Sequence, residues 1–190
     1  MQEKRNIILL LYIVTISGPS SARNLGSIEH CIDYYKTGMN FDLATLQGEH
    51  YAVYFWPPNQ RDRDTCAVIN YKKLPQHEFE NTLNGCNYTL PSNSTVIQAT
   101  YVNNVGKNIT LLYHGDEEVK YLYRSCNRIS RYIYIRLNDN YVLGINCSVG
   151  GRGVLLSKNL PSDIEVQSIV KSIDFMGGRE GASDCKLRPF

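Results

Sequence analysis

The six cysteines of this chain are widely separated and all follow an apolar N-terminal segment. No two are closer than about twenty residues; they are Cys31, Cys66, Cys86, Cys126, Cys147 and Cys185. Zinc sites need pairs of ligands a few residues apart, so this spacing indicates no metal site. An even number of cysteines in an oxidising compartment predicts instead that all are paired in disulfides, with no free catalytic thiol.

The N-terminal segment has the features of a removable secretory leader. Lys4 and Arg5 precede an apolar run over residues 7–16, and Ser20-Ser21-Ala22 is a small-residue cleavage site. An apolar run of about ten residues is shorter than the ~20 that span a bilayer. We therefore expect residues 1–22 to be a signal peptide and residues 23–190 to form one secreted, extracellular domain.

Four N-x-[ST] tripeptides agree with secretion. Their acceptors are Asn87, Asn93, Asn108 and Asn146. Single tripeptides recur by chance, and Asn146 precedes a cysteine that we expect to be bridged. We predict that at least one of the four carries a glycan.

Charge and hydropathy exclude several classes of partner. The formal net charge is only +2, which offers no basis for binding nucleic acid. No second long apolar segment follows residue 22, so we expect no membrane association. Fourteen tyrosines are a high count, and tyrosine favours strands and mixed apolar-polar pockets.

Short segments rich in β-branched and aromatic residues recur along the chain, separated by turn residues. Residues 51–56 end at Pro57, which cannot continue a central strand, and residues 131–136 alternate with the period of a half-buried strand. The other predicted strands are residues 66–71, 78–82, 95–102, 108–113, 119–123, 141–147 and 154–157. Residues 119–123 are either a ninth strand or a loop extension. Eight or nine short strands predict an antiparallel sandwich or a closed barrel.

One helix is predicted after the strands. Ser162 and Glu165 form a capping box, and an apolar stripe follows at Val166, Ile169, Val170 and Ile173. We expect the stripe to pack against the outside of the sheet.

This order of elements resembles the lipocalins, especially the arthropod bilin-binding proteins, insecticyanins, crustacyanin subunits and salivary lipocalins of bugs. The resemblance rests on residues 41–51, 140–147, 155–158 and 183–186. It implies an all-β fold: an eight-stranded antiparallel up-and-down barrel, with one C-terminal α-helix packed outside. His50 and Lys158 stand where the family has a tryptophan and the arginine that stacks on it. A His-Lys pair cannot stack with the same energy, so the barrel floor must be closed differently.

The resemblance also implies disulfide pairs. The family pattern joins Cys31 to Cys147 and Cys66 to Cys185. Cys86 and Cys126 are then left as an additional bridge that the family pattern does not supply.

An eight-stranded barrel can hold one small ligand, and strand alternation decides which side chains line it. If His50 points inward, Ala52, Tyr54 and Trp56 share its face. The residues that we predict to line the ligand site are Tyr54, Trp56, Ile69, Tyr71, Tyr101, Tyr132 and Tyr134. The alternative is that these aromatic side chains simply fill the barrel.

The resemblance implies a small hydrophobic ligand, such as a tetrapyrrole, a lipid or an amine. A bilin or a haem is a cofactor that such a barrel could take, although no histidine matches the family's haem-ligating position. No sequence motif for nucleophilic, metal-dependent or phosphate chemistry is present, so we expect no enzyme. A second hypothesis is a filled barrel whose outer loops bind a protein, for example a host protease or receptor. The oligomeric state is open.

Overall fold

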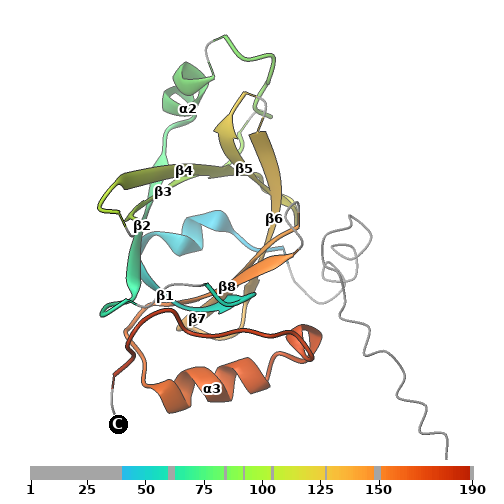
Figure 1. Ribbon diagram of the computed structural model, residues 1–190. Coiled ribbons are helices and arrows are strands. Elements are labelled where there is room, and N and C mark those ends of the chain that lie inside the picture. The colour runs from blue at the N-terminus through green and yellow to red at the C-terminus, as the bar shows by residue number, and fades with distance from the viewer. Residues whose placement is uncertain are drawn as a thin grey trace, which may run out of the picture.

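The computed structural model describes residues 40–59, 63–83, 85–91, 93–103, 105–126, 128–147 and 151–188. The predicted signal peptide and Cys31 lie outside these ranges. Within them, eight antiparallel strands close into one barrel, in which each strand pairs with its neighbour in the chain and β8 pairs with β1 (Figure 1). The strands are β1 (Gly48–Trp56), β2 (Ala67–Leu74), β3 (Val96–Val102), β4 (Asn108–His114), β5 (Lys120–Ser125), β6 (Arg128–Arg136), β7 (Tyr141–Asn146) and β8 (Arg152–Ser157).

The structure confirms the predicted up-and-down barrel with a C-terminal helix outside. Residues 119–123 overlap β5, which is an integral strand of the barrel and not a loop extension. The predicted strand at residues 78–82 is wrong, because this segment belongs to helix α2 (Gln76–Thr82). Phe79 is the one buried residue of α2. A strand would instead bury every second side chain of the segment. The count of strands is therefore eight.

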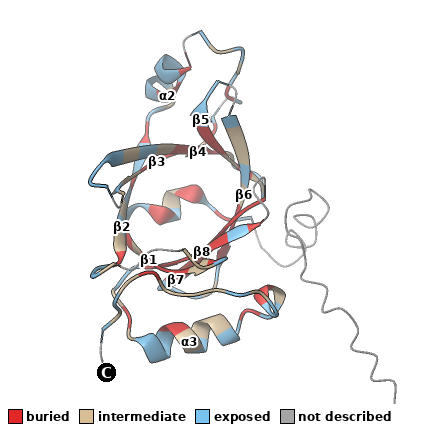
Figure 2. Ribbon diagram, viewed as in Figure 1, coloured by how far each residue is buried: buried red, intermediate tan, exposed pale blue. Residues whose placement is uncertain are grey.

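One side of the barrel is buried on both faces. All six residues of β7 are buried, although strand alternation turns half of them away from the barrel interior. Helix α3 (Asp163–Lys171) and the chain that follows it pack over β7, β8 and β1, as the buried residues in Figure 2 show. We call residues 160–188, which include the 3-10 turn η2 (Asp174–Met176), the C-terminal cover.

Helix α3 begins as the sequence predicts. The Ser162 hydroxyl accepts a hydrogen bond from the Glu165 backbone, and the Glu165 carboxylate accepts one from the Ser162 backbone. Both bonds satisfy N–H groups that a helix start leaves without partners. Val166 and Ile173 of the predicted stripe are fully buried, and Ile169 and Val170 pack beside them.

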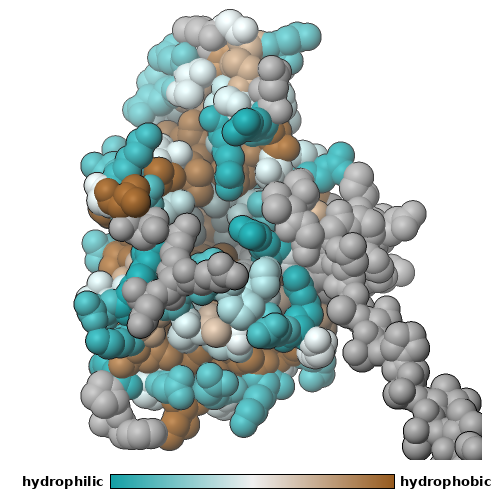
Figure 3. All heavy atoms as spheres, in the orientation of Figure 1, coloured by the Kyte–Doolittle hydropathy of each residue, from teal (hydrophilic) through white to brown (hydrophobic). Residues whose placement is uncertain are grey.

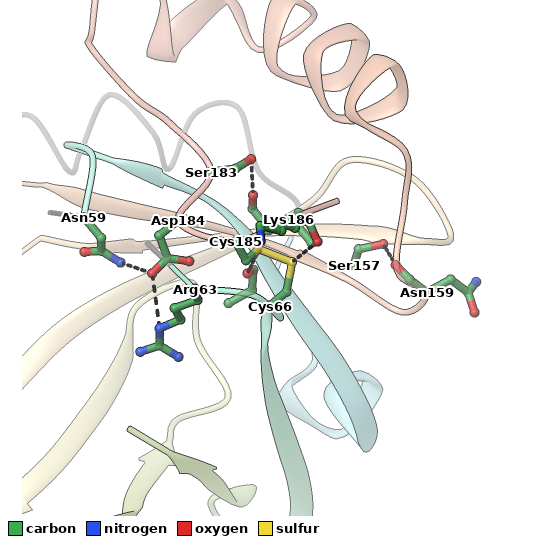
Figure 4. Close-up of a disulfide and its surroundings, with 11 residues drawn as sticks. Asn59, Arg63, Cys66, Ser157, Asn159, Ser183, Asp184, Cys185 and Lys186 are labelled. Carbon is green, nitrogen blue, oxygen red and sulfur yellow. Dashed lines mark hydrogen bonds and ion pairs between the residues drawn. A yellow bond between two sulfur atoms is a disulfide. The ribbon is translucent and has the colours of Figure 1, made fainter. Parts of the chain in front are cut away.

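A disulfide fastens the C-terminal cover to the barrel. Cys66 and Cys185 are bonded, with Cα atoms 4.8 Å apart and a sequence separation of 119 residues (Figure 4). This is the pair that the resemblance implies. Close by, the Phe55 and Ala182 backbones exchange two hydrogen bonds, so the tail pairs along the outer edge of β1.

A second projection packs on the opposite side of the barrel. We call residues 75–95, as far as they are described, the side lobe; it contains α2. Its core joins Phe79, Leu83 and Leu90 to outward-facing residues of β3 to β6, among them Leu112 and Tyr123. A disulfide between Cys86 and Cys126, with Cα atoms 5.1 Å apart, ties the lobe to the β5–β6 turn.

Cys147 is also disulfide-bonded. Its predicted partner, Cys31, lies outside the described residues, so that pairing stays a prediction.

A short apolar turn closes the barrel floor. The 3-10 turn η1 (Leu43–Leu46) crosses the barrel, and Leu43 and Leu46 are 1% and 0% exposed. Asp42 caps η1 by accepting a hydrogen bond from the Ala44 backbone at 2.8 Å. The Phe41 ring stacks on Tyr134 with centroids 5.5 Å apart. Aliphatic and aromatic packing from this turn therefore replaces the stacked pair that His50 and Lys158 cannot form.

Candidate ligand cavity

The barrel encloses a cavity of about 410 Å³ above this floor. A volume of this size lies within the range of small-molecule sites. Its apolar and aromatic wall comes from the inner faces of the strands and comprises Ala52, Phe55, Ala67, Ile69, Tyr71, Tyr101, Leu111, Tyr113, Tyr132, Tyr134 and Val154. Its polar groups are Asn59, Arg63, Arg124, Asn146, Arg152 and Asp184.

Most of the residues predicted to line the site lie where the sequence places them. The structure brings together Ile69, Tyr71, Tyr101, Tyr132 and Tyr134 around the cavity. Alternation along β2 and β6 accounts for this, since Ile133 and Ile135 turn outward into the core under α3. That these five side chains contact a ligand remains a prediction.

Tyr54 and Trp56 do not line the cavity, and this part of the prediction is wrong. The pairing of β1 with β8 shifts between Ala52 and Tyr54, so Val53 is an extra residue in β1. Such a bulge inverts the side-chain alternation beyond it. Ala52 and Phe55 therefore face the cavity, whereas Val53, Tyr54 and Trp56 all belong to the core under the C-terminal cover.

Contacts with the tail hold Tyr54 and Trp56 outside. The Tyr54 hydroxyl donates a hydrogen bond to the Gly181 carbonyl at 2.6 Å, and the Tyr54 and Trp56 rings lie 4.6 Å apart. A Cβ atom on Gly181 would come within 2.4 Å of the Tyr54 ring and 2.7 Å of the Trp56 ring. Only glycine allows the tail to approach these rings so closely.

The cavity wall is a continuous aromatic cluster. The Tyr113 ring meets Tyr132 and Tyr134 edge-on at 5.4 and 5.7 Å, and Tyr132 stacks on Tyr134 at 5.9 Å. These are the edge-on and stacked arrangements that aromatic rings prefer. Gly144, directly across from Tyr134, leaves room for that ring, because a Cβ there would lie 3.1 Å from it.

Burial keeps these phenols neutral. It raises the pKa of Tyr71, Tyr113, Tyr132 and Tyr134 above the ordinary value of 10. Arg124 opposes this rise at Tyr113 and Tyr132, because a nearby cation favours the phenolate. The hydroxyls therefore act at neutral pH as hydrogen-bond donors and acceptors and carry no charge.

The one acidic residue of the described wall is already paired. Asp184 is 3% exposed, and its Oδ2 lies 3.8 Å from Nε of Arg63. The same oxygen accepts a hydrogen bond from Asn59 at 3.1 Å (Figure 4). A buried carboxylate needs such partners, so Asp184 holds the β1–β2 connection and the tail together.

Histidines take no part in the described wall of the cavity. His50 is 1% exposed and meets the Tyr71 ring edge-on at 5.4 Å, below the cavity. Burial lowers its pKa from 6.5, which favours the neutral ring. His114 faces the side lobe, and His77 is exposed. The described wall thus offers no histidine as an axial ligand for a haem.

Metal sites and membrane spans find no support in the described ranges. No group of three His, Cys, Asp or Glu side chains lies close enough there to hold a metal ion. No helix in these ranges is both long and apolar enough to cross a bilayer.

The four predicted glycan acceptors differ in exposure. Asn87, Asn93 and Asn108 are exposed, and glycans on them stay a prediction. Asn146 is 4% exposed and faces the cavity, so a glycan on its amide is incompatible with this barrel. Its position on the inner face of β7 could be read from the alternation of that strand.

Solved structures with a similar fold include a lobster protein and a hornworm protein. Lobster apocrustacyanin A1 matches with a TM-score of 0.47 and 9% identity over 77% of this chain and 81% of that chain. Insecticyanin from the tobacco hornworm, Manduca sexta, matches with a TM-score of 0.47 and 12% identity over 80% and 84%. No protein-family model matches the sequence, and no curated protein matches it. On the evidence of its closed eight-stranded up-and-down barrel and outer C-terminal helix, the chain has a lipocalin-like fold.

Proposed function

We propose that this protein binds a small, largely apolar ligand inside the barrel and carries or sequesters it outside the cell. The observation that carries the proposal is the cavity of about 410 Å³ with its wall of neutral phenols and aliphatic side chains. Such a wall buries apolar surface while its hydroxyls orient polar atoms of the ligand. A barrel whose aromatic side chains were only core would leave little space between them, so the cavity supports binding over that alternative.

The size and chemistry of the cavity favour some ligands over others. Its volume of about 410 Å³ lies toward the lower end of the range of roughly 300–1,000 Å³ for small-molecule sites. A tetrapyrrole such as a bilin is much larger, and a haem would lack a histidine ligand in the described wall. A lipid or a single aromatic system fits better.

Native mass spectrometry with a blocked variant tests this function. Ile69 lines the cavity, and Ile69→Trp places a large ring in it, whereas its neighbour Val68 is 38% exposed on the outer face of β2. We expect a small molecule to co-purify with the unmodified protein and with Val68→Trp, and to be lost in Ile69→Trp. A protein that is purified without any bound small molecule and that binds no apolar probe would contradict the proposal.

An outer loop supports the second candidate function, protein binding. Val102 and Val105 at the β3–β4 hairpin are 53% and 77% exposed. Figure 3, in the orientation of Figure 1, shows a small brown patch on the side of the molecule where the β3–β4 hairpin ends. Exposed apolar side chains at a loop tip are a common feature of protein contacts. If this hairpin is the functional surface, Val102→Asp should remove activity toward the partner and Ile69→Trp should not.

A further inference from the structure

The described cavity wall carries two positive charges that no described acid balances. Arg63 is neutralised by Asp184, as described above. Arg124 and Arg152 make no ion pair with any residue in the described ranges, and both are exposed. A small cavity with an aromatic and aliphatic part and a polar part thus has two unpaired guanidinium groups in its wall.

Strand register directs Arg152 toward the cavity. It occupies the inner face of β8, two residues before Val154, which also lines the wall. Asn146 lies directly across from Arg152, and Tyr132 lies directly across from Asn146. A phenol, an amide and a guanidinium therefore form one cross-strand row at the end of the barrel away from η1.

Arg124 acts on the same part of the wall from β5. It follows the inward-facing Leu122 by two residues and lines the cavity. Its charge reaches the hydroxyls of Tyr113 and Tyr132, whose ionisation it favours. Arg124 and Arg152 thus lie on either side of Tyr132, on β5 and β8, with β6 and β7 between them.

We propose that the ligand is an anionic amphiphile, whose carboxylate is bound by Arg124 and Arg152 at the cavity mouth while its apolar body lies among the tyrosines. The inference rests on the proposed function and names the chemical class of its ligand. Guanidinium groups bind carboxylates through paired, charge-assisted hydrogen bonds, and the neutral Tyr132 hydroxyl and Asn146 amide can donate further ones. An amine would instead meet two uncompensated cations.

The accessibility of the two arginines is consistent with this role. Both side chains are exposed, so neither bears the cost of an unpaired buried charge. A carboxylate that enters between them is stabilised near a low-dielectric cavity, where charge pairs are stronger than in bulk water. Arg63, by contrast, is engaged by Asp184 and serves to position the tail.

Calorimetry on the full chain with three head groups tests the proposal. The probes are straight-chain carboxylates, alcohols and amines of matched length, from six to sixteen carbons. We expect carboxylates to bind at least about tenfold more tightly than the alcohols, and the amines to bind most weakly. The affinity of the carboxylates should rise with chain length and stop rising once the chain is longer than the cavity can hold.

Matched variants separate charge recognition from cavity binding. Arg124→Gln and Arg152→Gln should each weaken carboxylate binding about tenfold and leave alcohol binding unchanged. Lys72→Gln, which removes an exposed charge on β2, should change neither. Thermal unfolding checks that each variant is folded.

Two outcomes overturn the inference in distinguishable ways. If alcohols bind as tightly as carboxylates, or if the arginine variants weaken both equally, the anionic head group is wrong and cavity binding stands. If no probe of any head group binds, and Ile69→Trp changes nothing, the proposed function fails together with the inference.

Discussion

The C-terminal cover and the side lobe are both joined to the barrel by a disulfide, and each contains a helix. They differ in how much of the barrel they bury, in the sequence separation of their bridges and in how their helices begin. The cover buries β7 on both faces and joins segments 119 residues apart in sequence. The lobe has a smaller core around Phe79, and its bridge joins segments 40 residues apart. Helix α3 has a capping box, whereas Pro75 gives α2 no side-chain cap. We infer that the cover is part of the barrel's stability and the lobe is an addition to it.

Removing each bridge is the strongest test of this difference. In the chain-entropy model, the Cys66→Ala/Cys185→Ala variant should lose about 5 kcal/mol of unfolding free energy, and Cys86→Ala/Cys126→Ala about 4 kcal/mol. Guanidinium unfolding of each double variant, which leaves no unpaired partner, measures both values. If removing the lobe bridge costs more unfolding free energy than removing the cover bridge, the lobe contributes more to the stability of the barrel than the cover does.

Truncating one buried aromatic side chain in each region should give the next largest loss of stability. Trp56 is 2% exposed and Phe79 is 0% exposed, so either change to alanine should cost about 3–5 kcal/mol by leaving a cavity. The two variants should differ in where they loosen the fold. In hydrogen exchange, Trp56→Ala should deprotect β1, β8 and α3, whereas Phe79→Ala should deprotect only α2 and its neighbours.

Gly181→Ala is a second probe of the cover. The added Cβ collides with the Tyr54 and Trp56 rings. In hydrogen exchange, this variant should therefore lose protection in the same elements as Trp56→Ala. Global loss of protection in Phe79→Ala would show that the lobe and the barrel unfold as one unit.

The lobe should make stability depend on pH through His114. Its ring stacks on Tyr121 at 5.3 Å and its Nε2 lies 2.7 Å from the Tyr88 hydroxyl. Burial lowers the His114 pKa from 6.5 to about 4, with Asp116 opposing the shift. Between these values the unfolded chain binds a proton that the folded chain does not, so stability should fall by about 1–3 kcal/mol as the pH drops from 6.5 to 4.

Two histidine variants isolate that contribution. His114→Gln should flatten the dependence of the unfolding free energy on pH, because the titrating group is gone. His77→Gln, which alters an exposed histidine on α2, should leave the dependence as it is. If the unfolding free energy depends equally on pH in the unmodified protein and in both variants, groups other than His114 cause the dependence.

The smallest effect concerns the helix starts. Ser162→Ala removes the side-chain cap of α3 and should cost about 1 kcal/mol. Ser168→Ala, on the exposed face of the same helix, should cost nothing or stabilise slightly, because alanine has the higher helix propensity. Urea midpoints of the two variants measure the difference. A loss in Ser168→Ala as large as in Ser162→Ala would remove the cap as the cause.

Alternation and capping made most of the barrel and α3 predictable from sequence, and local exceptions account for the rest. Residues 131–136 alternate, so Tyr132 and Tyr134 could be assigned to one face. The extra residue at Val53 has no signature side chain, and it becomes visible only through pairing with β8. Residues 78–82 are short and follow a proline without a polar cap, so neither helix nor strand had a decisive signal.

The polar end of the cavity was not predictable in the same way. Arg63 and Asp184 are far apart in sequence and meet only because the tail returns along β1. Arg124 and Arg152 appear in sequence as ordinary surface charges. Their shared direction depends on the register of two strands that pair with others and not with each other.

The extra residue at Val53 also places the tryptophan and the cavity tyrosines of the protein in two separate environments. By turning Trp56 outward, it places the one tryptophan of the chain against the tail and leaves only tyrosines and Phe55 as the aromatic side chains of the described cavity wall. Tryptophan emission should therefore follow docking of the C-terminal cover, and tyrosine absorbance should follow occupancy of the cavity. One protein thus carries two spectroscopic reporters, and undocking of the tail can be recorded separately from ligand entry without adding a label.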